Sequence, residues 1–297
     1  MQRPIPDCKT GWIASHRVRR RFEPISSPTL PSFSIVTISF NQAQFLRAAM
    51  DSVLSQEGID LQYIVCDAGS TDGSRAIIES YDDPRIISVF EEDAGPADGL
   101  NKGFARAKGS LFGYLNSDDL LLPGALTRVA RFFAERPQID VACGHAHAID
   151  TEGHHLRRVW SEPYWPPAVA RGAFIQIQPS TFFRADIFRK SGGFEIADRA
   201  SWDAGLLARM YAAGAQFAVV DDFLSAYRLH GESITMSGRL AQRQTDNLQR
   251  RAPLLLGRDF RSGDIAIGHA LRAIKHLRWP MRLLERVLRG PMAGRAE

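Results

Sequence analysis

The apolar run Leu111–Leu115 ends abruptly at Asn116-Ser117-Asp118-Asp119. A short apolar run that stops at polar side chains predicts a buried strand, which delivers those side chains to one edge of a sheet. Two adjacent carboxylates repel each other unless a positive charge joins them, and Mg²⁺ or Mn²⁺ takes oxygen ligands of this kind. The competing interpretation is a solvated turn, because Asn, Ser and Asp also favour turns and helix N-caps.

Strand-like and helix-like segments alternate along the first half of the chain. Apolar, β-branched runs predict strands over 33–38, 63–66, 86–90 and 111–115, and helical spacing predicts helices over 42–54, 72–81, 96–107 and 123–135. This alternation predicts an α/β fold with an open, mostly parallel sheet flanked by helices. The pattern loosens after Ile149, where a helix over 203–213 and a strand over 217–220 are predicted. The chain beyond Gly238 is predicted to be helical, with breaks at Pro253 and Pro280.

Length and composition set outer limits on the kind of protein. The 297 residues can form one large domain or two small ones. No apolar stretch is long enough to cross a bilayer, and no apolar segment of a signal peptide follows the basic residues 17–21, so a cytoplasmic location is expected. Cys66 and Cys143 lie beside strand-like residues and are predicted to be core residues, while the wide spacing of Cys8, Cys66 and Cys143 suggests neither a zinc site nor a disulfide framework.

The positive charge is concentrated at the two ends of the chain. The net charge is +4 with a pI of about 9.1, and we divide the chain into a Pro- and Arg-rich arm (1–31), a central domain (32–236) and a basic helical tail (237–297). In the tail, apolar residues at roughly helical spacing run from Leu271 to Leu288. Either this stripe packs on the domain with the arginines in water, or the tail contacts an anionic membrane. A nucleic-acid partner is not expected.

In open α/β sheets, ligands bind outside the carboxyl ends of the strands. Residues 39–41, 67–73, 91–95 and 116–119 follow the four predicted strands, and three of these four segments are acidic. Such crowding suits a metal ion and the hydrogen-bond donors of a base or sugar. Asp67 is predicted to accept a hydrogen bond from an N–H group of the base. Asp72 is predicted to cap the next helix. Neither a dinucleotide fingerprint nor a Gly-x-x-x-x-Gly-Lys-Ser/Thr loop is present.

Four segments together resemble the family 2 glycosyltransferases of GT-A fold. Residues 35–41, 65–74, 98–103 and 116–119 fall in family order at family spacing, and the resemblance covers about residues 33–236. It implies a nucleotide-sugar half (32–120), an acceptor half (121–236), and a nucleotide-diphosphate sugar bound across the strand ends. The donor contacts it implies are Ser39, Asn41, Asp67, Asp98, Asn101, Lys102, Asn116, Ser117 and Arg228. It also implies that Mn or Mg binds to Asp118, with Asp119 and His230 as further ligands. Asn116 stands where many members carry Asp, so it offers an oxygen without charge.

Two later segments complete the resemblance. Gly192-Gly193-Phe194 precedes Trp202-Asp203, which implies that Asp203 is the general base, although Asp203 could also cap its helix. Tyr227-Arg228-Leu229-His230 resembles the late Arg-X-His element, so Arg228 and His230 could instead hold the leaving diphosphate. Residues 178–180 are expected to face the sugar or acceptor. His145, His147, His154 and His155 match no motif and are predicted to be surface or acceptor-side residues.

The resemblance implies a hexosyltransferase-type reaction with inversion at the sugar carbon. The acceptor would be a carbohydrate or a lipid-linked hydroxyl compound, in polysaccharide or glycoconjugate synthesis. If the basic tail contacts a membrane, the expected location is its inner face. A nucleotidyltransferase is the less favoured alternative, because residues 39–42 are not a Gly/Lys/Arg-rich phosphate loop. A non-catalytic sugar-nucleotide-binding subunit stays open, because Arg199-Ala200-Ser201 replaces the acidic neighbourhood usual before the base.

Overall fold

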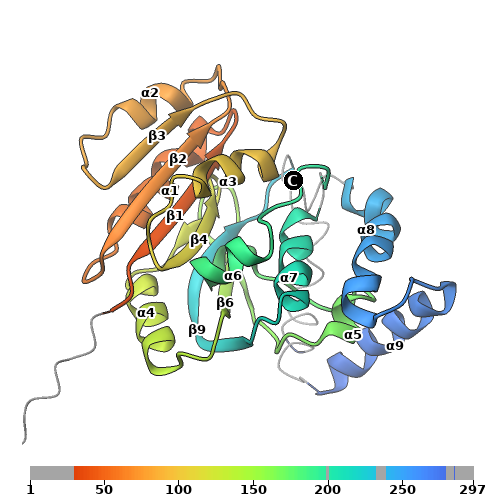
Figure 1. The fold of residues 1–297 in the computed structure, drawn as a ribbon. Helices are drawn as coiled ribbons and strands as arrows, with labels where there is room; N and C mark the ends of the chain where they lie inside the picture. Colours follow the sequence, from red (N-terminus) through yellow and green to blue (C-terminus); the bar gives the residue numbers. More distant parts are fainter. Residues whose placement is uncertain (1–29, 199–200, 232–238, 279–283, 285–297) are drawn as a thin grey trace, which may run out of the picture.

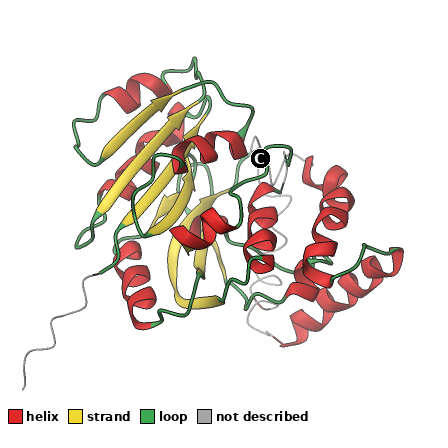
Figure 2. Ribbon diagram, in the orientation of Figure 1, coloured by secondary structure: helices red, strands yellow, loops and turns green. Residues whose placement is uncertain are grey.

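A computed structural model describes residues 30–198, 201–231, 239–278 and 284 (Figure 1). One sheet runs through the molecule, with helices on both of its faces (Figure 2). Within the described ranges the sheet has nine strands in the order β3-β2-β1-β4-β8-β6-β9-β5, and β7 pairs with β6. The predicted open α/β sheet flanked by helices is confirmed.

The first half of the sheet is wholly parallel. It contains β1 (Phe33–Ser39), β2 (Leu61–Asp67), β3 (Ile86–Phe90) and β4 (Leu111–Asn116), connected through α1 (Ala43–Leu54), α2 (Ser74–Glu79) and α3 (Pro96–Phe104). Each of these elements was predicted, and their ends move by three residues or fewer. α2 begins at Ser74 and not at Asp72, because the Asp72 carboxylate accepts hydrogen bonds from the Ser74 amide and hydroxyl and so lies before the helix.

The second half mixes strand directions. It contains β5 (Leu120–Leu121), α4 (Ala125–Glu135), β6 (Val141–Ile149), β7 (His155–Val159), α5 (Pro166–Val169), a 3₁₀ turn (Gln178–Ser180), β8 (Thr181–Arg184), α6 (Ala185–Lys190), α7 (Trp202–Ala212) and β9 (Phe217–Arg228). β8 lies antiparallel between β4 and β6, while β6 and β9 are parallel. No strand was predicted at β6, β7 or β8, and β9 continues well beyond the predicted 217–220. The exposed Asp221 and a register shift beside His145 interrupt the apolar pattern there.

Two apolar cores lie on opposite faces of the sheet. One core joins the sheet to α1 and α4 through residues such as Leu46, Val53 and Phe133. The other joins the sheet to α3, α6 and α7, and Phe104 and Phe188 lie in it with ring centroids 4.7 Å apart. Cys66 and Cys143 are buried free thiols in this second core, as predicted; Cys8 lies outside the described residues.

The tail forms α8 (Arg239–Leu256) and α9 (Ser262–Arg278). Figure 1 shows α8 lying beside α7, and Ala252 and Leu255 of α8 are buried. The predicted break at Pro253 is wrong, because Pro253 lies inside α8. It stands in the last turn, where its missing N–H removes one helical hydrogen bond and only three residues of the helix follow. Pro280 lies outside the described residues, as do residues 1–29 of the arm. None of the described helices is both long and apolar enough to span a membrane.

α9 docks on the chain around Arg171 through polar contacts. Asp264 is almost completely buried, and its carboxylate accepts hydrogen bonds from Arg171 Nε at 2.8 Å and from two nitrogens of Arg258 at 2.8 Å each. Gly268 lies against Arg171, whose carbonyl oxygen would be 2.3 Å from a Cβ at that position. Of the predicted apolar stripe, Leu271 is half-buried and Ile274 and Leu284 are 50% and 48% exposed, while Met281 and Leu288 lie outside the described residues.

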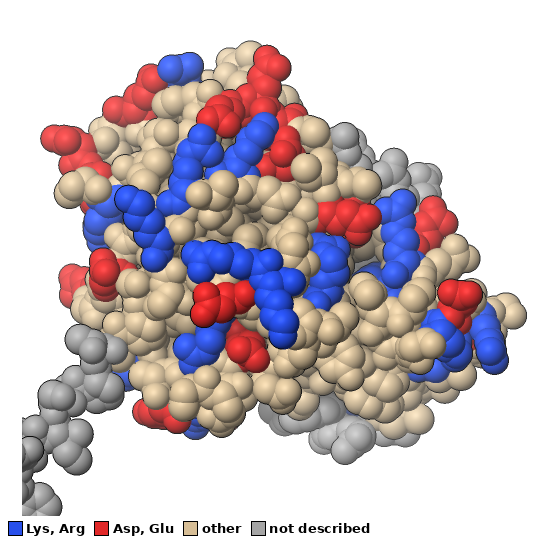
Figure 3. Space-filling model, in the orientation of Figure 1, with Lys and Arg blue, Asp and Glu red and all other residues tan. Residues whose placement is uncertain are grey.

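Charges of both signs are interspersed over the surface. Figure 3 shows Lys and Arg side chains gathered across the middle of one face, over α3 and α6, with acidic side chains among them. Several are paired, including Arg106 with Glu91 and Lys102 with Asp98. Several basic side chains on this face are therefore paired with acidic neighbours and do not form one uninterrupted positive patch.

We predict that Asp264→Asn loosens the docking of α9. One carboxylate here serves two arginines, and breaking this group should cost roughly 1–3 kcal/mol, less than a wholly buried pair because Arg258 is partly exposed. Trypsin should then cut the tail faster than in the wild-type protein. Asp259→Asn is the matched control, because Asp259 is exposed and only its backbone carbonyl contacts Arg258. Equal cleavage rates in the two variants would contradict the docking role.

The same contact has a defined pH dependence. Arg258 and Arg171 hold the pKa of Asp264 well below its usual range. A group with a depressed folded-state pKa stabilises the protein above its unfolded pKa of about 3.9 and loses that contribution as the pH falls. The difference in the free energy of unfolding between Asp264→Asn and wild type should therefore be full at neutral pH and shrink as the pH falls below about 4. Chemical denaturation measures it, because trypsin is inactive in acid.

Candidate active site

The parallel register brings the carboxyl ends of three strands level with one another. Ser39 at the end of β1 pairs with Asp67 at the end of β2, and Ile38 pairs with Asn116 at the end of β4. The polar segments that follow these strands therefore meet at one edge of the sheet, as predicted from the positions of the apolar runs.

Polar side chains of the β1 and β2 loops hold one another in place. Asn41 has a φ of +53°, and its Oδ1 accepts a hydrogen bond from the Thr71 amide at 2.9 Å. Asp67 is buried and accepts hydrogen bonds from the Gly69 and Ser70 amides and from the Ser70 hydroxyl. These contacts favour a role for Asp67 in building the turn, and its predicted contact with a base would be an additional one.

Asp72 joins the same two loops from the other side. Its carboxylate accepts hydrogen bonds from Ala43 N at 2.8 Å and Ser74 N at 3.0 Å, so one side chain caps two helices. This geometry agrees with the capping role that was preferred for Asp72 over a ligand role. The loops are thus rigidly tied before any ligand binds.

Two buried polar atoms in these loops have no hydrogen-bond partner. They are Ser39 Oγ and Gln42 Oε1, and a buried polar atom without a partner costs roughly 1–3 kcal/mol. Phe40 between them is 60% exposed. A ligand that hydrogen bonds to these atoms would remove the cost. Neither Phe40 nor Gln42 was predicted as a site residue, although an aromatic residue within a polar strand-end loop was a signal.

Asp118 and His230 come together from positions 112 residues apart. His230 Nε2 lies 2.9 Å from Asp118 Oδ2, and the imidazole packs against the Phe45 ring of α1 with centroids 5.1 Å apart. His230 is buried, and the Asp118 side chain is 18% exposed. The pairing therefore places one carboxylate and one imidazole at the same point beside the carboxyl end of β4.

Asp119 has a different environment from Asp118. Its buried carboxylate accepts the Arg228 amide at 3.0 Å. Burial, together with the neighbouring charge of Asp118, raises the pKa of Asp119 well above its usual value. This contact favours a structural role, joining the β4 loop to the end of β9, over the predicted role as a metal ligand.

Arg228 holds the same loop through its guanidinium. Nε donates to the Asp118 carbonyl at 3.0 Å, and Nη1 donates to the carbonyls of Asp150 and Thr151 at 2.7 and 2.9 Å. The group also lies over the Phe45 ring at 4.8 Å. Burial lowers the pKa of Arg228. These contacts favour a role in shaping the Asp118 loop, and a direct donor contact stays a prediction.

Asp118 and His230 could provide two protein ligands for a divalent ion, which is fewer than a metal site built wholly from protein side chains would have. Among the residues that the structure describes, no three His, Cys, Asp or Glu side chains gather into a metal site. Mg²⁺ and related ions are commonly held by only one or two protein groups, with water and substrate phosphates as the other ligands. Asp118 and His230 could supply two such groups. Asn116 donates its amide to Gln178 Oε1 at 3.0 Å, and Ser117 is buried beside it.

The predicted contacts on α3 are all engaged within the protein. Asp98 accepts the Ala94 amide at 2.9 Å and pairs with Lys102 at 3.1 Å. The Asn101 amide makes two hydrogen bonds to the backbone of Phe194. Asp98 and Lys102 remain partly exposed and could still reach a ligand, whereas the Asn101 contacts indicate another function.

Asp203 lies in the first turn of α7. Its Oδ1 accepts the Ala204 amide at 2.7 Å. Burial raises the pKa of Asp203, while this hydrogen bond and the charge of Arg251 on α8 act in the opposite direction. The nearby Tyr114 hydroxyl of β4 is buried without a hydrogen-bond partner. Arg251 was not predicted to act here, because nothing in the sequence of the basic tail distinguishes the one arginine whose charge acts on this carboxylate.

His145 was predicted to be a surface or an acceptor-side residue, and its burial contradicts the first of these two alternatives. It is buried, its Nδ1 accepts the Ser161 amide at 3.1 Å, and its Nε2 lies 3.0 Å from Asp221. The imidazole that accepts at Nδ1 carries its proton on Nε2 and donates it to Asp221. His147 stacks on Phe223 with centroids 4.6 Å apart. The histidines of β6 thus belong to the packing between β6 and β9.

Comparisons with known proteins agree on one family. Residues 34–192 match the family model described as glycosyl transferase family 2. An uncharacterized glycosyltransferase of Nostoc sp. is 26% identical over 222 residues, which cover 70% of this chain and 68% of that protein. The succinoglycan biosynthesis protein ExoO of Rhizobium meliloti is 27% identical over 228 residues, and the match covers 71% of this chain and 64% of that protein. The chain therefore spans just under two thirds of ExoO.

Solved structures share the fold at low sequence identity. S. aureus TarS 1–349 in complex with UDP-GlcNAc superposes with a TM-score of 0.63 at 16% identity, covering 88% of this chain and 76% of that chain. The mannosyltransferase PcManGT from Pyrobaculum calidifontis, in complex with GDP-Man and Mn²⁺, gives a TM-score of 0.59 at 17% identity, covering 87% and 74%. At these identities the likeness shows the fold alone.

We predict that Asp118→Asn and Asp119→Asn separate the two neighbouring carboxylates. Asp118→Asn should weaken Mn²⁺ binding in the presence of UDP at least tenfold, because it removes the charge beside His230. Asp119→Asn should leave Mn²⁺ binding nearly unchanged, because an amide oxygen can still accept the Arg228 N–H. Titration followed by electron paramagnetic resonance measures free Mn²⁺ directly. A larger loss in Asp119→Asn than in Asp118→Asn would reverse the assignment.

Proposed function

The chain belongs to glycosyl transferase family 2, and from this premise we propose that it transfers a hexosyl group from a nucleotide-diphosphate sugar to an acceptor hydroxyl, with inversion and with a divalent metal. The single observation that carries the proposal is the Asp118–His230 pair beside the carboxyl end of β4. It lies at the strand edge that also presents the unpartnered Ser39 Oγ and Gln42 Oε1. Such an edge offers both a metal-binding carboxylate and hydrogen-bonding groups for a nucleotide.

The related proteins support this class of donor and product. One solved neighbour carries UDP-GlcNAc, and another carries GDP-Man with Mn²⁺. Relatives are named for succinoglycan biosynthesis and, in Escherichia coli, as a chondroitin synthase that is 25% identical over 224 residues. We therefore propose a role in polysaccharide or glycoconjugate synthesis, with a carbohydrate or lipid-linked acceptor.

Asp203 would act as the general base. Its Oδ1 is held by the Ala204 amide, which orients the carboxylate and leaves Oδ2 to accept the proton of the acceptor hydroxyl. As that oxygen bonds to the anomeric carbon, the bond from this carbon to the diphosphate breaks and its electron pair leaves with the diphosphate. Positioned base catalysis typically contributes roughly 10²–10⁴-fold in rate.

Asp118 and His230 would hold the metal, and Arg228 fixes the loop on which Asp118 stands. When bound, a divalent ion at this position neutralises negative charge on the departing diphosphate. The buried Arg228 hydrogen bonds keep the Asp118 backbone from moving as charge shifts, so the binding groups are in place beforehand. Rigid positioning of this kind is commonly the largest contribution to catalysis.

The two alternatives make different demands on the same residues. A nucleotidyltransferase needs a basic or glycine-rich phosphate loop after the first strand, and residues 39–42 contain no Gly, Lys or Arg. A non-catalytic sugar-nucleotide-binding subunit needs the donor site but no base. If a substitution of Asp203 abolishes sugar transfer but leaves donor binding unchanged, the protein is a catalyst and not a binding subunit.

We predict that Asp203→Asn lowers kcat by roughly 10²-fold or more while donor binding is preserved, because the substitution is nearly isosteric and removes only the base. A thermal-shift screen of nucleotide sugars with Mn²⁺ first identifies the donor, since a ligand at 100 times its Kd stabilises by about 2.7 kcal/mol. Asp186→Asn, on the exposed side of α6, is the control and should keep full activity. Loss of the thermal shift in Asp203→Asn would indicate a structural role instead.

The raised pKa of Asp203 adds a pH signature to this prediction. The base works only when it is ionised, so kcat should rise with pH through a pKa above that of an ordinary Asp. Asp203→Asn should remove this acid limb from the profile of its residual activity. An acid limb that persists unchanged in the variant would assign the titration to another group.

We further propose that the tail makes peripheral contact with a membrane, where a lipid-linked acceptor would lie. Ile265, Ile267 and Ile274 on α9 are each 45–50% exposed. The electrostatic part of such binding is smaller than the composition indicates, because Arg272 donates to the Gly172 carbonyl and Lys275 pairs with Glu162. Exposed apolar side chains, helped by Arg261, would supply the contact.

The test of membrane contact is co-sedimentation with anionic and neutral liposomes. Truncation near Gly238 is unsuitable, since it would remove the buried Ala252 and Leu255 of α8 from the core beside α7. We predict that the double substitution Ile267→Ser and Ile274→Ser lowers the bound fraction on anionic liposomes severalfold. Ile175→Ser, at an exposed residue outside the tail, is the control. Binding that is unchanged by the double substitution would exclude α9 as the contact.

A further inference from the structure

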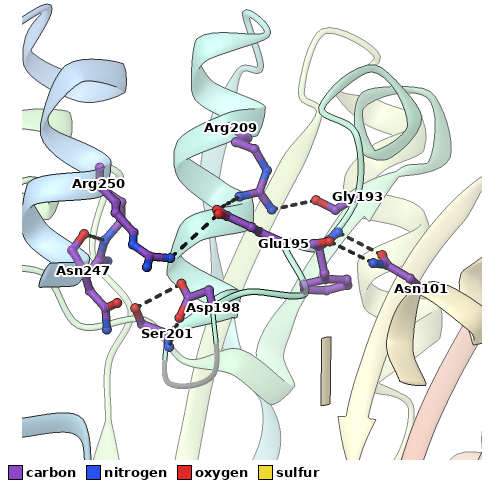
Figure 4. Close-up of polar contacts among 10 residues, drawn as sticks. Asn101, Gly193, Glu195, Asp198, Ser201, Arg209, Asn247 and Arg250 are labelled. Carbon is purple, nitrogen blue, oxygen red and sulfur yellow. Dashed lines mark hydrogen bonds and ion pairs between the residues drawn. The ribbon is translucent and has the colours of Figure 1, made fainter. Parts of the chain in front are cut away.

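The side chain of Asn101 on α3 forms two hydrogen bonds to the backbone of Phe194, which lies 93 positions later in the chain. Its Nδ2 donates to the Phe194 carbonyl at 2.8 Å, and its Oδ1 accepts the Phe194 amide at 2.9 Å. One side-chain amide thus satisfies both backbone groups of Phe194, as a neighbouring strand would (Figure 4). The Phe194 ring packs 5.3 Å from Tyr114 and 5.5 Å from Trp202, measured between centroids.

Gly193 is fitted to this contact. Its φ is +72°, a conformation that favours glycine, and a Cβ at this position would lie 2.9 Å from Asn101 Oδ1. The Gly193 carbonyl accepts a hydrogen bond from Arg209 of α7 at 2.6 Å. The turn that begins with Gly192-Gly193 is therefore held by α3 on one side and by α7 on the other.

The same turn precedes α7 in the chain, and residues 199 and 200 between them lie outside the described ranges. The Glu195 carboxylate forms two ion pairs: Oε2 lies 3.4 Å from Arg209 Nη1, and Oε1 lies 3.8 Å from Arg250 Nη1 of α8. Asp198 accepts the Ser201 amide at 2.9 Å, and the Ser201 carbonyl accepts the Gly205 amide as α7 begins. Figure 4 shows Asn101 beside the turn, Gly193 and Glu195 in contact with Arg209, Glu195 in contact with Arg250, and the Asp198–Ser201 contact as a separate pair. Asp203 stands two residues after Ser201, at the end of the segment that Asn101 anchors.

We propose that Asn101 is a positioning residue for Asp203 and not a contact to the donor. This inference rests on the proposed function, in which Asp203 is the base. α3 also carries Asp98 and Lys102 at the donor edge, so one helix both borders the donor site and fixes the segment that delivers the base. By binding the backbone of Phe194, Asn101 fixes the position of the segment that leads to Asp203 relative to the carboxyl ends of the strands.

The first test separates binding from turnover. Asn101→Ala leaves both backbone groups of Phe194 without their partner, and a base displaced by about 1 Å can cost up to about 100-fold in rate. We expect kcat to fall between roughly 10- and 100-fold, while the Kd for UDP with Mn²⁺ stays within about twofold. A raised Kd with an unchanged kcat would overturn the proposal, because it would place Asn101 on the donor.

A double-mutant cycle tests whether Asn101 acts through Asp203. If it does, Asn101→Ala should lower kcat by less than about threefold in the Asp203→Asn background, because the group it positions is already gone. Full additivity of the two losses would overturn the proposal. Asn101→Asp serves if the alanine variant folds poorly, since it is isosteric, keeps the acceptor for the Phe194 amide and loses the donor to the carbonyl.

Gln62→Ala is the matched control. Gln62 also bridges separate segments through its amide, since Nε2 donates to the Arg106 carbonyl at 3.0 Å and Oε1 accepts the Lys108 amide at 2.8 Å. It lies near the start of β2, at the opposite end of the strand from Asp67. Its loss should lower the melting temperature without changing kcat. A similar loss of kcat in Gln62→Ala would show that general destabilisation explains the effect of Asn101→Ala.

Hydrogen exchange gives a readout that needs no activity. Asn101→Ala should speed amide exchange at Phe194, Ser201 and the first turn of α7, and leave the ends of β1 and β2 unchanged. Unchanged exchange at Phe194 and Ser201 would overturn the proposal. A wild-type chain that transfers no sugar, together with faster exchange in the variant, would contradict the proposed function and still support Asn101 as the anchor of this segment.

Discussion

The parallel register of β1, β2 and β4 is the constraint on which the rest of the site depends. Backbone hydrogen bonds between these strands place Ser39 opposite Asp67 and Ile38 opposite Asn116, so the polar loops begin at the same level. A slip of one residue would turn the buried side chains of all three strands to the wrong face, where they would meet water. The two apolar cores on either side of the sheet make such a slip costly, and they therefore also secure the position of the site.

Most polar residues at the strand ends are occupied with the protein itself. Asp67 and Asp72 tie the β1 and β2 loops together, and Arg228 holds the carbonyls around Asp118. Fixing these groups before a ligand arrives lowers the ordering cost that binding must overcome. Among the described residues, the groups that could still reach a ligand are fewer than the acidic sequence indicates. They include Asp118 with His230, the unpartnered Ser39 Oγ and Gln42 Oε1, the partly exposed Asp98 and Lys102, and one oxygen of Asp203.

The C-terminal helices are part of the catalytic domain and not an appendage. α8 packs on α7, and the charge of its Arg251 acts on Asp203 against the effect of burial. α9 is held by the Asp264 carboxylate between two arginines, which uses basic residues that would otherwise face water or a membrane. The family model ends at residue 192, so α8 and α9 lie outside the part of the chain that it matches, although Arg171 lies within it.

The sequence by itself determined the first half of the fold and the edge at which the site lies. Apolar runs such as Leu111–Leu115 alternate with helical spacing, and this local pattern reflects burial on a sheet, so it can be read without knowing the partners. β6 to β9 were largely hidden, because their neighbours come from distant segments and the exposed Asp221 and a register shift break the pattern. The candidate site residues can be named from their type and position in the sequence, but their contacts cannot. Asn101 looks the same in sequence whether it faces a donor or the backbone of Phe194, and Asp118 and Asp119 are adjacent and chemically identical. Only the tertiary structure decides such cases, because hydrogen-bond partners and burial are set by segments tens to hundreds of residues away.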